Sequence, residues 1–275
     1  NKGNYIISLG ELCQWISEKA MELGVDIFPG FPAQKYLTDE SGRVIGIATG
    51  DMGVDKEGNQ KGTYTPGMDI LAKQTIFAEG ARGHLGKKLI KVFNLDEGKT
   101  PQHFAIGFKE VWEVDNDKHS PGDVVHSMGW PLKGGTSGGG FLYHFDNNRI
   151  AVGLIVDLNY SNPSHSPFQE FQQFKQHPSI KQYLESGKRV SYGARAITKG
   201  GINSLVKMEF DGGMIVGCDA GTLNPSKIKG SHCALQSGIL AAEYINKVLS
   251  EENCDFDDLF KSSALYKELY ESKNF

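Results

Sequence analysis

One acidic residue, Asp219, lies between an apolar strand and a long helix, in the glycine-containing stretch from Gly213 to His232. At such a junction a carboxylate can accept hydrogen bonds from a sugar-alcohol chain, and the free amides of the helix start can stabilise negative charge on a reduced ring. Glycines at positions 221 and 230 let the backbone approach a flat ligand. The combination predicts a flavin-binding element; the alternative is an ordinary strand–loop–helix connection in which the aspartate makes a turn.

The elements on either side of this loop follow from the apolar pattern. Residues 213–216 are an apolar strand, and apolar side chains recur at three- and four-residue spacing after Gly230, which predicts a long helix that Ser231 can cap. A second junction of this kind, residues 75–84, takes an apolar strand into a glycine loop before a predicted short helix at 85–93. Two similar junctions therefore frame the middle of the chain.

The first part of the chain predicts a helix and a small antiparallel meander. Apolar residues from Leu9 to Leu23 share one helical face, and Gly24 follows as a stop signal. Short extended segments come next, separated by two sequences typical of hairpin turns, Asp39–Arg43 and Asp55–Asn59. The predicted extended segments are residues 25–28, 32–38, 44–50 and 70–78.

Between about residues 100 and 205 the pattern changes to longer alternating strands, which favours antiparallel pairing. Pro178 separates two short helical segments in this region. We expect a second domain around a sheet whose face can close over the ring end of a cofactor. The predicted strands are residues 104–114, 124–130, 140–145 and 150–158, and the predicted helices are residues 168–176 and 179–184.

The most glycine-dense loop, Gly134–Gly140, contains a formal match to the nucleophile elbow of serine hydrolases around Ser137. That match is rejected, because the elbow needs a strand directly before the serine and a helix after it, whereas Pro131 precedes this loop and a strand at 141–145 follows. A glycine run instead leaves peptide groups bare for a ligand close to the backbone. The alternative is a flexible surface hairpin.

Composition excludes several classes of function. The formal net charge of the 275 residues is −4, and no basic block is interleaved with aromatic residues, so we expect no nucleic-acid binding. The apolar runs are far shorter than the ~20 residues that cross a bilayer. Neither the eight histidines nor the four cysteines show metal-site spacing, so no metal site is expected. No Gly-x-Gly-x-x-Gly follows a strand, and the usual pyrophosphate-binding turn is therefore missing.

Taken together, these segments resemble the electron-transfer flavoprotein:ubiquinone oxidoreductase family along essentially the whole chain. The segments that carry the resemblance are residues 4–10, 46–53, 75–80, 129–132, 136–144, 177–180, 192–196 and 227–232. The resemblance implies an α+β or α/β fold: part of a FAD domain of the glutathione-reductase or hydroxybenzoate-hydroxylase type, with an inserted, mostly antiparallel-sheet quinone-binding domain. The expected division is 1–95 and 207–275 for the FAD domain and 96–206 for the quinone-binding domain.

The resemblance also implies binding residues. Asp219 and Gly221 fall in the second flavin motif, although Cys218 stands where many related flavoproteins have Gly. Lys229 and Gly230 are then expected near the pyrimidine edge of the flavin ring.

Two further pairs are implied in the same way. Glu79 and Gly80 are expected to approach the cofactor from the other strand junction. Gly138 and Gly139 correspond to the pair whose backbone approaches the quinone ring. No side chain is expected to act as a nucleophile, because the redox chemistry belongs to the cofactors.

The implied activity is that of an enzyme, a FAD-dependent oxidoreductase that passes electrons from reduced electron-transfer flavoprotein to ubiquinone in the respiratory chain. The parent protein would also carry a 4Fe-4S cluster, for which this chain has no ligands. It would lie peripherally or monotopically on the inner membrane, at the bacterial cytoplasmic face or the mitochondrial matrix face, whereas this segment itself looks soluble. The start at Asn1 rather than Met suggests a processed product or an excerpt. Because the family's pyrophosphate loop is missing, we expect this segment by itself to bind FAD weakly or not at all.

Other functions stay open at this point. One is a flavin-dependent reductase of isoprenoid double bonds, of the geranylgeranyl type, which shares the fold and can use a similar apolar pocket. Another is a non-catalytic fragment that holds a lipid or a partner protein. A more distant one is an acyl-transfer enzyme that uses Ser137.

Overall fold

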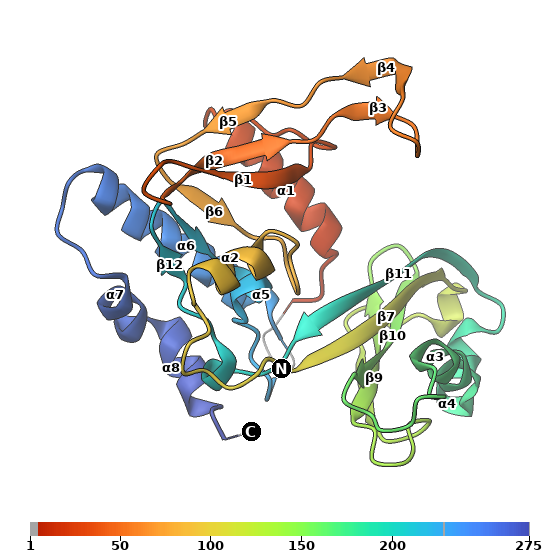
Figure 1. The fold of residues 1–275 in the computed structure, drawn as a ribbon. Helices are drawn as coiled ribbons and strands as arrows, with labels where there is room; N and C mark the ends of the chain where they lie inside the picture. Colours follow the sequence, from red (N-terminus) through yellow and green to blue (C-terminus); the bar gives the residue numbers. More distant parts are fainter. Residues whose placement is uncertain (1–4, 228, 275) are drawn as a thin grey trace. The chain divides into compact units, whose positions relative to one another are not determined.

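The computed structural model describes residues 5–227 and 229–274 (Figure 1). The chain divides into two compact units, each assembled from separate stretches of sequence. Unit 1 comprises Asn1–Ile27 and Phe104–Ala196, and unit 2 comprises Phe28–His103 and Ile197–Phe275. Within the described residues, no helix is both long and apolar enough to cross a membrane.

Unit 1 is built around a five-stranded sheet with the strand order β11-β7-β10-β9-β8. Strand β10 pairs antiparallel with both β7 and β9, and β9 pairs antiparallel with β8. The four strands expected here are confirmed, and β11 is a strand that the sequence pattern did not reveal. Their bounds are β7 (Phe104–Glu113), β8 (Val124–Met128), β9 (Gly138–Phe145), β10 (Arg149–Asp157) and β11 (Lys188–Thr198).

Helices α3 (Pro167–Gln176) and α4 (Pro178–Leu184) pack against this sheet (Figure 1). Phe171 and Phe174 of α3 are buried in the same cluster as the apolar residues of β9 and β10. Pro178 stands in the first turn of α4, where a missing amide costs no intrahelical hydrogen bond. The expected break between the two helices is therefore confirmed. A short 3-10 turn, η1 (Asn116–Lys118), follows β7.

The amino-terminal helix α1 (Leu9–Glu22) begins and ends where the sequence predicts. The Ser8 hydroxyl accepts a hydrogen bond from the Glu11 amide, and Gly24 after the helix has the left-handed φ of 86°. The expected strand at 25–28 is wrong, because these residues pair with no other strand in the described part of the chain. An apolar run without a partner does not become a strand.

Unit 2 contains two three-stranded sheets and a hairpin. In the sheet β12-β13-β6, strands β13 and β6 are parallel and β12 and β13 antiparallel. The sheet β1-β2-β5 is antiparallel, which confirms the expected meander, and β3 and β4 form the hairpin. The bounds are β1 (Ala33–Thr38), β2 (Val44–Thr49), β3 (Met52–Val54), β4 (Gln60–Thr65), β5 (Asp69–Leu71), β6 (Thr75–Phe77), β12 (Glu209–Phe210) and β13 (Gly213–Ile215).

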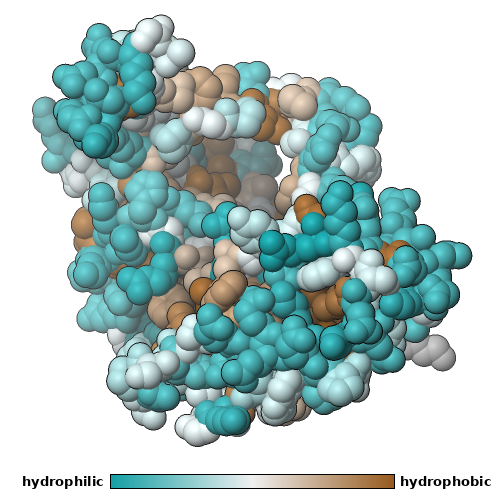
Figure 2. Space-filling model, turned by 90° about the vertical axis from the view of Figure 1, so that its right-hand side faces the viewer, coloured by the Kyte–Doolittle hydropathy of each residue, from teal (hydrophilic) through white to brown (hydrophobic). Residues whose placement is uncertain are grey.

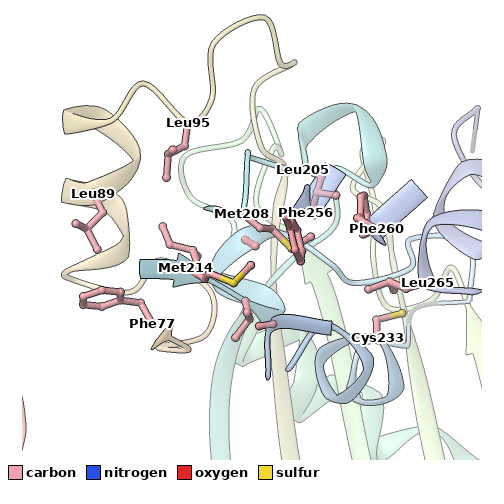
Figure 3. Packing of buried hydrophobic residues seen from close by; sticks show 14 of the residues in the cluster. Phe77, Leu89, Leu95, Leu205, Met208, Met214, Cys233, Phe256, Phe260 and Leu265 are labelled. Atoms are coloured by element: carbon pink, nitrogen blue, oxygen red, sulfur yellow. The ribbon is translucent and has the colours of Figure 1, made fainter. Parts of the chain in front are cut away.

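The helices of unit 2 enclose the core drawn in Figure 3. Phe77 of β6 and Met214 of β13 are buried with Phe256, Phe260 and Leu265 from the carboxy-terminal helices. These packed side chains hold the parallel strands β6 and β13 against the carboxy-terminal helices. The helical segments are α2 (Gly86–Val92), η2 (Ile202–Ser204), α5 (Gly217–Ala220), α6 (Ser231–Leu249), α7 (Phe256–Ser262) and α8 (Ala264–Glu271).

The surface is mixed in character. The face drawn in Figure 2 is largely hydrophilic and carries scattered hydrophobic patches. Large apolar side chains remain exposed in both units, among them Met128 and Trp130 in unit 1 and Ile239 in unit 2. Single exposed apolar residues are common on protein surfaces and define no site by themselves.

Candidate cofactor site

The site in unit 2 lies where two parallel strands end side by side. Ile215 of β13 pairs with Phe77 of β6, and the Val216 amide continues the ladder by donating to the Phe77 carbonyl at 3.0 Å. The loop 78–85 after β6 and the connection from β13 through Val216 into the helix that begins at Gly217 therefore start at the same edge of the sheet. Ligands of α/β sheets bind at the carboxyl ends of the strands, so this edge is the chemically favoured position.

Asp219 is the central residue of this edge. It lies in the short helix α5, and only 7% of its surface is exposed. Its Oδ2 accepts a hydrogen bond from the Glu79 amide at 3.3 Å, which joins the two loops across 140 residues of sequence. Gly221 ends α5 with a left-handed φ of 98°, a conformation that favours glycine. The two predicted flavin-motif residues thus lie within the same short helix and directly after it.

Glu79 is committed to a structural task. Its Oε2 accepts hydrogen bonds from the Leu85 and Gly86 amides at 2.9 and 2.7 Å, at the start of α2. Its Oε1 lies 2.9 Å from Nδ1 of His84. The Glu79 carboxylate therefore holds together the two ends of the loop 80–85. The backbone amide of Glu79 separately donates a hydrogen bond to Asp219. Gly80, beside it, has a left-handed φ of 80° and open space where a side chain would stand.

The electrostatics of this edge follow from burial. Burial raises the pKa of Asp219 from its ordinary 3.8 to about 6, and the nearby Glu79 carboxylate adds to the rise. The amides of Glu79 and Gly83 and the ring of His84 act in the opposite direction. Near neutral pH a carboxyl group with this pKa is mostly ionised and accepts hydrogen bonds, which suits a partner with several hydroxyl groups.

Two glycines that the sequence analysis did not single out allow the loops to meet. A Cβ on Gly86 would lie 2.3 Å from Oδ1 of Asp219, and one on Gly83 would lie 2.8 Å from the same atom. Both distances are far below van der Waals contact. The spacing Gly80-x-x-Gly83-x-x-Gly86 was the available signal, but a sequence alone does not say which carboxylate fills the space.

The loop after α5 leads to the start of the long helix α6. Asn224 and Lys229 form an isolated antiparallel bridge, with their backbone N–O distances at 3.0 and 3.4 Å. Gly230 is the residue before the helix, and no side chain among the described residues caps the helix start. The expectation that Ser231 would cap α6 is wrong, because Ser231 is already the first helical residue and its hydroxyl cannot stand in the cap position. The uncapped end keeps its positive partial charge.

The arrangement fits part of a FAD molecule. An acidic residue at a parallel strand end, an uncapped helix start and glycines between them suit the sugar-alcohol chain and the ring. The Thr222 hydroxyl, directly after Gly221, is fully buried and has no hydrogen-bond partner in the described part of the protein. The pyrophosphate turn is not among residues 1–275, so these residues would hold only one side of the cofactor.

The glycines predicted for quinone binding lie in unit 1, and they are strand residues. Gly138 pairs with Val156, and Gly139 pairs with both Ile155 and Met128. The expectation of a bare glycine loop up to residue 140 is therefore wrong, because the last three glycines belong to β9. A Cβ on Gly139 would lie 2.6 Å from the Ser127 carbonyl oxygen, so close strand packing already requires glycine there. Ser137 precedes a strand, as the rejection of the nucleophile elbow assumed.

A cavity of about 310 Å³ lies away from this site. Its lining includes Gln74 and Gly212, which directly precede the two parallel strands, and Gly213, the first residue of β13, together with Arg43 and Tyr244. It therefore lies at the amino ends of the strands and contains none of the predicted flavin residues.

Comparisons with known proteins relate both units of the chain to proteins named electron transfer flavoprotein-ubiquinone oxidoreductase. Residues 104–197 match the family model described as "ETF-QO, ubiquinone-binding". The whole chain is 60% identical over 282 residues to the electron transfer flavoprotein-ubiquinone oxidoreductase of Pseudomonas aeruginosa, and covers 51% of it. It is 47% identical over 286 residues to the mitochondrial protein of the same name from Homo sapiens. That match includes the whole of this chain and 46% of the relative.

Solved structures show the same type of fold. A geranylgeranyl bacteriochlorophyll reductase-like protein from Thermoplasma acidophilum matches 91% of this chain and 58% of its own, with a TM-score of 0.68 and 18% identity. The flavin-dependent brominase Bmp2 matches 94% of this chain and 58% of its own, with a TM-score of 0.62 and 16% identity. At such identities the likeness shows the fold alone, and it confirms the expected α+β flavoprotein fold.

The sequence comparisons are more specific than the likeness in fold, because the matching segments extend through both units at 47–60% identity. The chain spans about half the length of the curated relatives it matches. Over its whole length, this chain is therefore similar to about half of the electron transfer flavoprotein-ubiquinone oxidoreductases named above.

Proposed function

We propose that this chain is the part of a FAD-dependent oxidoreductase that brings FAD and ubiquinone together, in an enzyme that passes electrons from reduced electron-transfer flavoprotein to ubiquinone. The observation that carries the proposal is the whole-length similarity to proteins named for this activity. Independent support comes from the buried Asp219 beside the carboxyl ends of two parallel strands, a position where α/β sheets bind ligands.

Unit 2 is the part proposed to bind FAD. Asp219 would accept hydrogen bonds from the sugar-alcohol chain, with Gly221 leaving room for it. The loop with Lys229 and Gly230 would face the pyrimidine edge of the ring, where the uncapped start of α6 stabilises negative charge. Glu79 and Gly80 would complete the site from the other strand end. The bound flavin supplies the redox chemistry.

Unit 1 is the part proposed to bind ubiquinone. The ubiquinone-binding family model covers residues 104–197, which supports this division. Gly138 and Gly139 would bring their backbone close to the quinone ring, beside Met128, which pairs with Gly139 and is exposed. The domain boundaries expected from the sequence, at residues 95 and 206, stay a prediction.

The remaining features of the parent protein are also proposals. They are a 4Fe-4S cluster held by residues outside this chain, peripheral attachment to the inner membrane, and direct contact with electron-transfer flavoprotein. The name of the human relative contains the word mitochondrial, which is consistent with the inner-membrane expectation. The isoprenoid-reductase alternative receives no specific support, because its structural neighbour is only 18% identical to this chain.

The test uses the full-length protein. Reduced electron-transfer flavoprotein and a soluble ubiquinone analogue are supplied, and quinone reduction is followed by absorbance. Asp219→Ala should lose FAD and activity together, whereas Asp257→Ala, on the exposed surface of α7, should keep both. A full-length protein that binds FAD but transfers no electrons from reduced electron-transfer flavoprotein to the quinone would refute the proposal.

A further inference from the structure

Glu268 of α8 joins both ends of the loop that precedes α6. Its Oε1 accepts a hydrogen bond from Nδ2 of Asn224 at 2.8 Å, at the beginning of that loop. The same oxygen lies 2.8 Å from Nε2 of His232, in the first turn of α6, and 3.2 Å from the Lys227 ammonium between them. One carboxylate therefore contacts three side chains of a segment that is 36 to 44 residues away in sequence.

The position of Glu268 is fixed by the core. Leu265 and Leu269, on the same face of α8, are 1% and 0% exposed and belong to the core of unit 2. The Ser263 hydroxyl accepts a hydrogen bond from the Tyr266 amide and caps the helix. The carboxylate is thus presented by a helix that cannot move without opening the core.

Asn224 turns this contact into a fixed loop shape. It is 1% exposed, and its Oδ1 accepts hydrogen bonds from the Ser226 amide at 3.0 Å and the Lys227 amide at 3.1 Å. Its Nδ2 donates to Glu268, so both ends of the buried amide are satisfied. A fully satisfied buried polar group favours a single conformation, since any other would leave it unpaired.

The cluster also meets the geometric condition for a metal site, because ligand atoms of His232, Cys233 and Glu268 lie within 4.8 Å of one another. The Lys227 ammonium and the Asn224 amide already donate to the Glu268 oxygen that a cation would need. A positive charge at 3.2 Å opposes a bound cation. The arrangement is therefore better described as a hydrogen-bonded clamp.

We propose that Glu268 is a positioning residue for the flavin: it clamps the loop 222–230 and thereby sets the geometry and the charge that the ring meets at the start of α6. The inference rests on the proposed function, because the loop is the part of unit 2 expected to face the ring. Neither the family resemblance nor the sequence pattern pointed to Glu268, which lies in a helix with no motif.

The first arm of the test measures the loop alone. Amide hydrogen exchange of residues 223–229 is followed in the full-length protein without FAD, in Glu268→Ala, in Glu268→Gln and in the control Glu271→Ala, an exposed residue of the same helix. The Lys229 amide should exchange about tenfold faster in Glu268→Ala, since a charged hydrogen-bond partner of the loop is lost. The control should match the wild type, and Glu268→Gln, which keeps an acceptor, should lie between.

The second arm measures the bound flavin. The FAD dissociation constant should rise about tenfold in Glu268→Ala, which is the affinity equivalent of one lost charged hydrogen bond. The flavin midpoint potential should become more positive in Glu268→Gln, because Lys227 then lacks its counter-charge and stabilises the reduced anion. Lys227→Met should shift the potential in the opposite direction. A role in folding alone predicts no such pair of opposite shifts.

The outcomes separate the two proposals. If the wild-type protein binds no FAD, the proposed function fails, and the exchange rates still test the clamp. If the Lys229 amide exchanges equally in Glu268→Ala and Glu271→Ala, the clamp is refuted whatever the flavin does. If exchange rises but the two potentials do not move apart, the loop is clamped without any effect on the ring, and the positioning role is refuted.

Discussion

Asp219→Asn should stabilise unit 2 at neutral pH, although it removes a group at the centre of the site. The pKa of Asp219 is raised to about 6, mainly by burial. Because the folded-state pKa lies above the unfolded value of 3.8, the folded protein binds the proton more tightly than the unfolded chain. The ionised carboxylate therefore destabilises the fold, and the stability of the protein falls as the pH rises between about 4 and 6.

The size of the effect follows from the shift. A pKa raised from 3.8 to about 6 corresponds to about 3 kcal/mol of destabilisation above pH 6. Asn keeps the oxygen that accepts the Glu79 amide and cannot ionise. We expect a gain of about 2 to 3 kcal/mol in the unfolding free energy of unit 2 at pH 7.5, and a gain near zero at pH 4, where Asp219 is protonated in the folded protein.

The measurement must separate the two units. Trp15, Trp112 and Trp130, the three tryptophans of the chain, all lie in unit 1, so their fluorescence in urea reports only that unit. Hydrogen exchange of β6 and β13 in the protein without FAD reports unit 2. In Asp219→Asn, exchange protection should rise at pH 7.5, while the fluorescence transition stays unchanged.

A surface carboxylate provides the control for this prediction. Asp257→Asn, on the exposed side of α7, should change protection by less than about 1 kcal/mol at either pH, because its ion pair with Lys261 is exposed to solvent. Equal stability of Asp219→Asn and the wild type at pH 7.5, or an equal gain at both pH values, would show that burial of the carboxylate does not govern this site.

Two further predictions concern unit 1, and both are read from tryptophan fluorescence during urea unfolding. Glu110→Ala should cost about 3 kcal/mol, because the Lys175 ammonium, 2.9 Å from the carboxylate and 10% exposed, then stays buried without its partner; a loss below 1 kcal/mol would contradict the reasoning. Although burial opposes it, Lys175 holds the pKa of Glu110 below its ordinary value, so this contribution should be lost as the pH falls through the acidic range. Gly140→Ala should cost about 1 to 3 kcal/mol, because the new Cβ would lie 2.2 Å from the Phe174 ring. Gly193→Ala, where nothing lies within 4 Å, is its control, and equal effects of the two substitutions would refute the packing argument.

The residue sequence by itself determined the local elements. The apolar spacing and the Gly24 stop signal predicted α1 within a residue or two, and alternation predicted four strands of the unit 1 sheet. These signals act over one or two turns of chain, so no tertiary contact is needed to read them. The flavoprotein resemblance was also available from short segments, since each one is a contiguous motif.

The tertiary structure decided which of these elements meet. Residues 25–28 have the composition of a strand but pair with no strand in the part of the chain that the structure describes. The glycines at 138–140 are needed by the neighbouring strands and by Phe174. Asp219 acquires its raised pKa because the tertiary structure buries it, and the Glu79 carboxylate, 140 residues earlier in the chain, adds to the rise. Glu268 carries no motif and becomes significant only where α8 packs beside the loop before α6. Long-range burial and charge depend on the choice among many possible partners, and no local pattern encodes that choice.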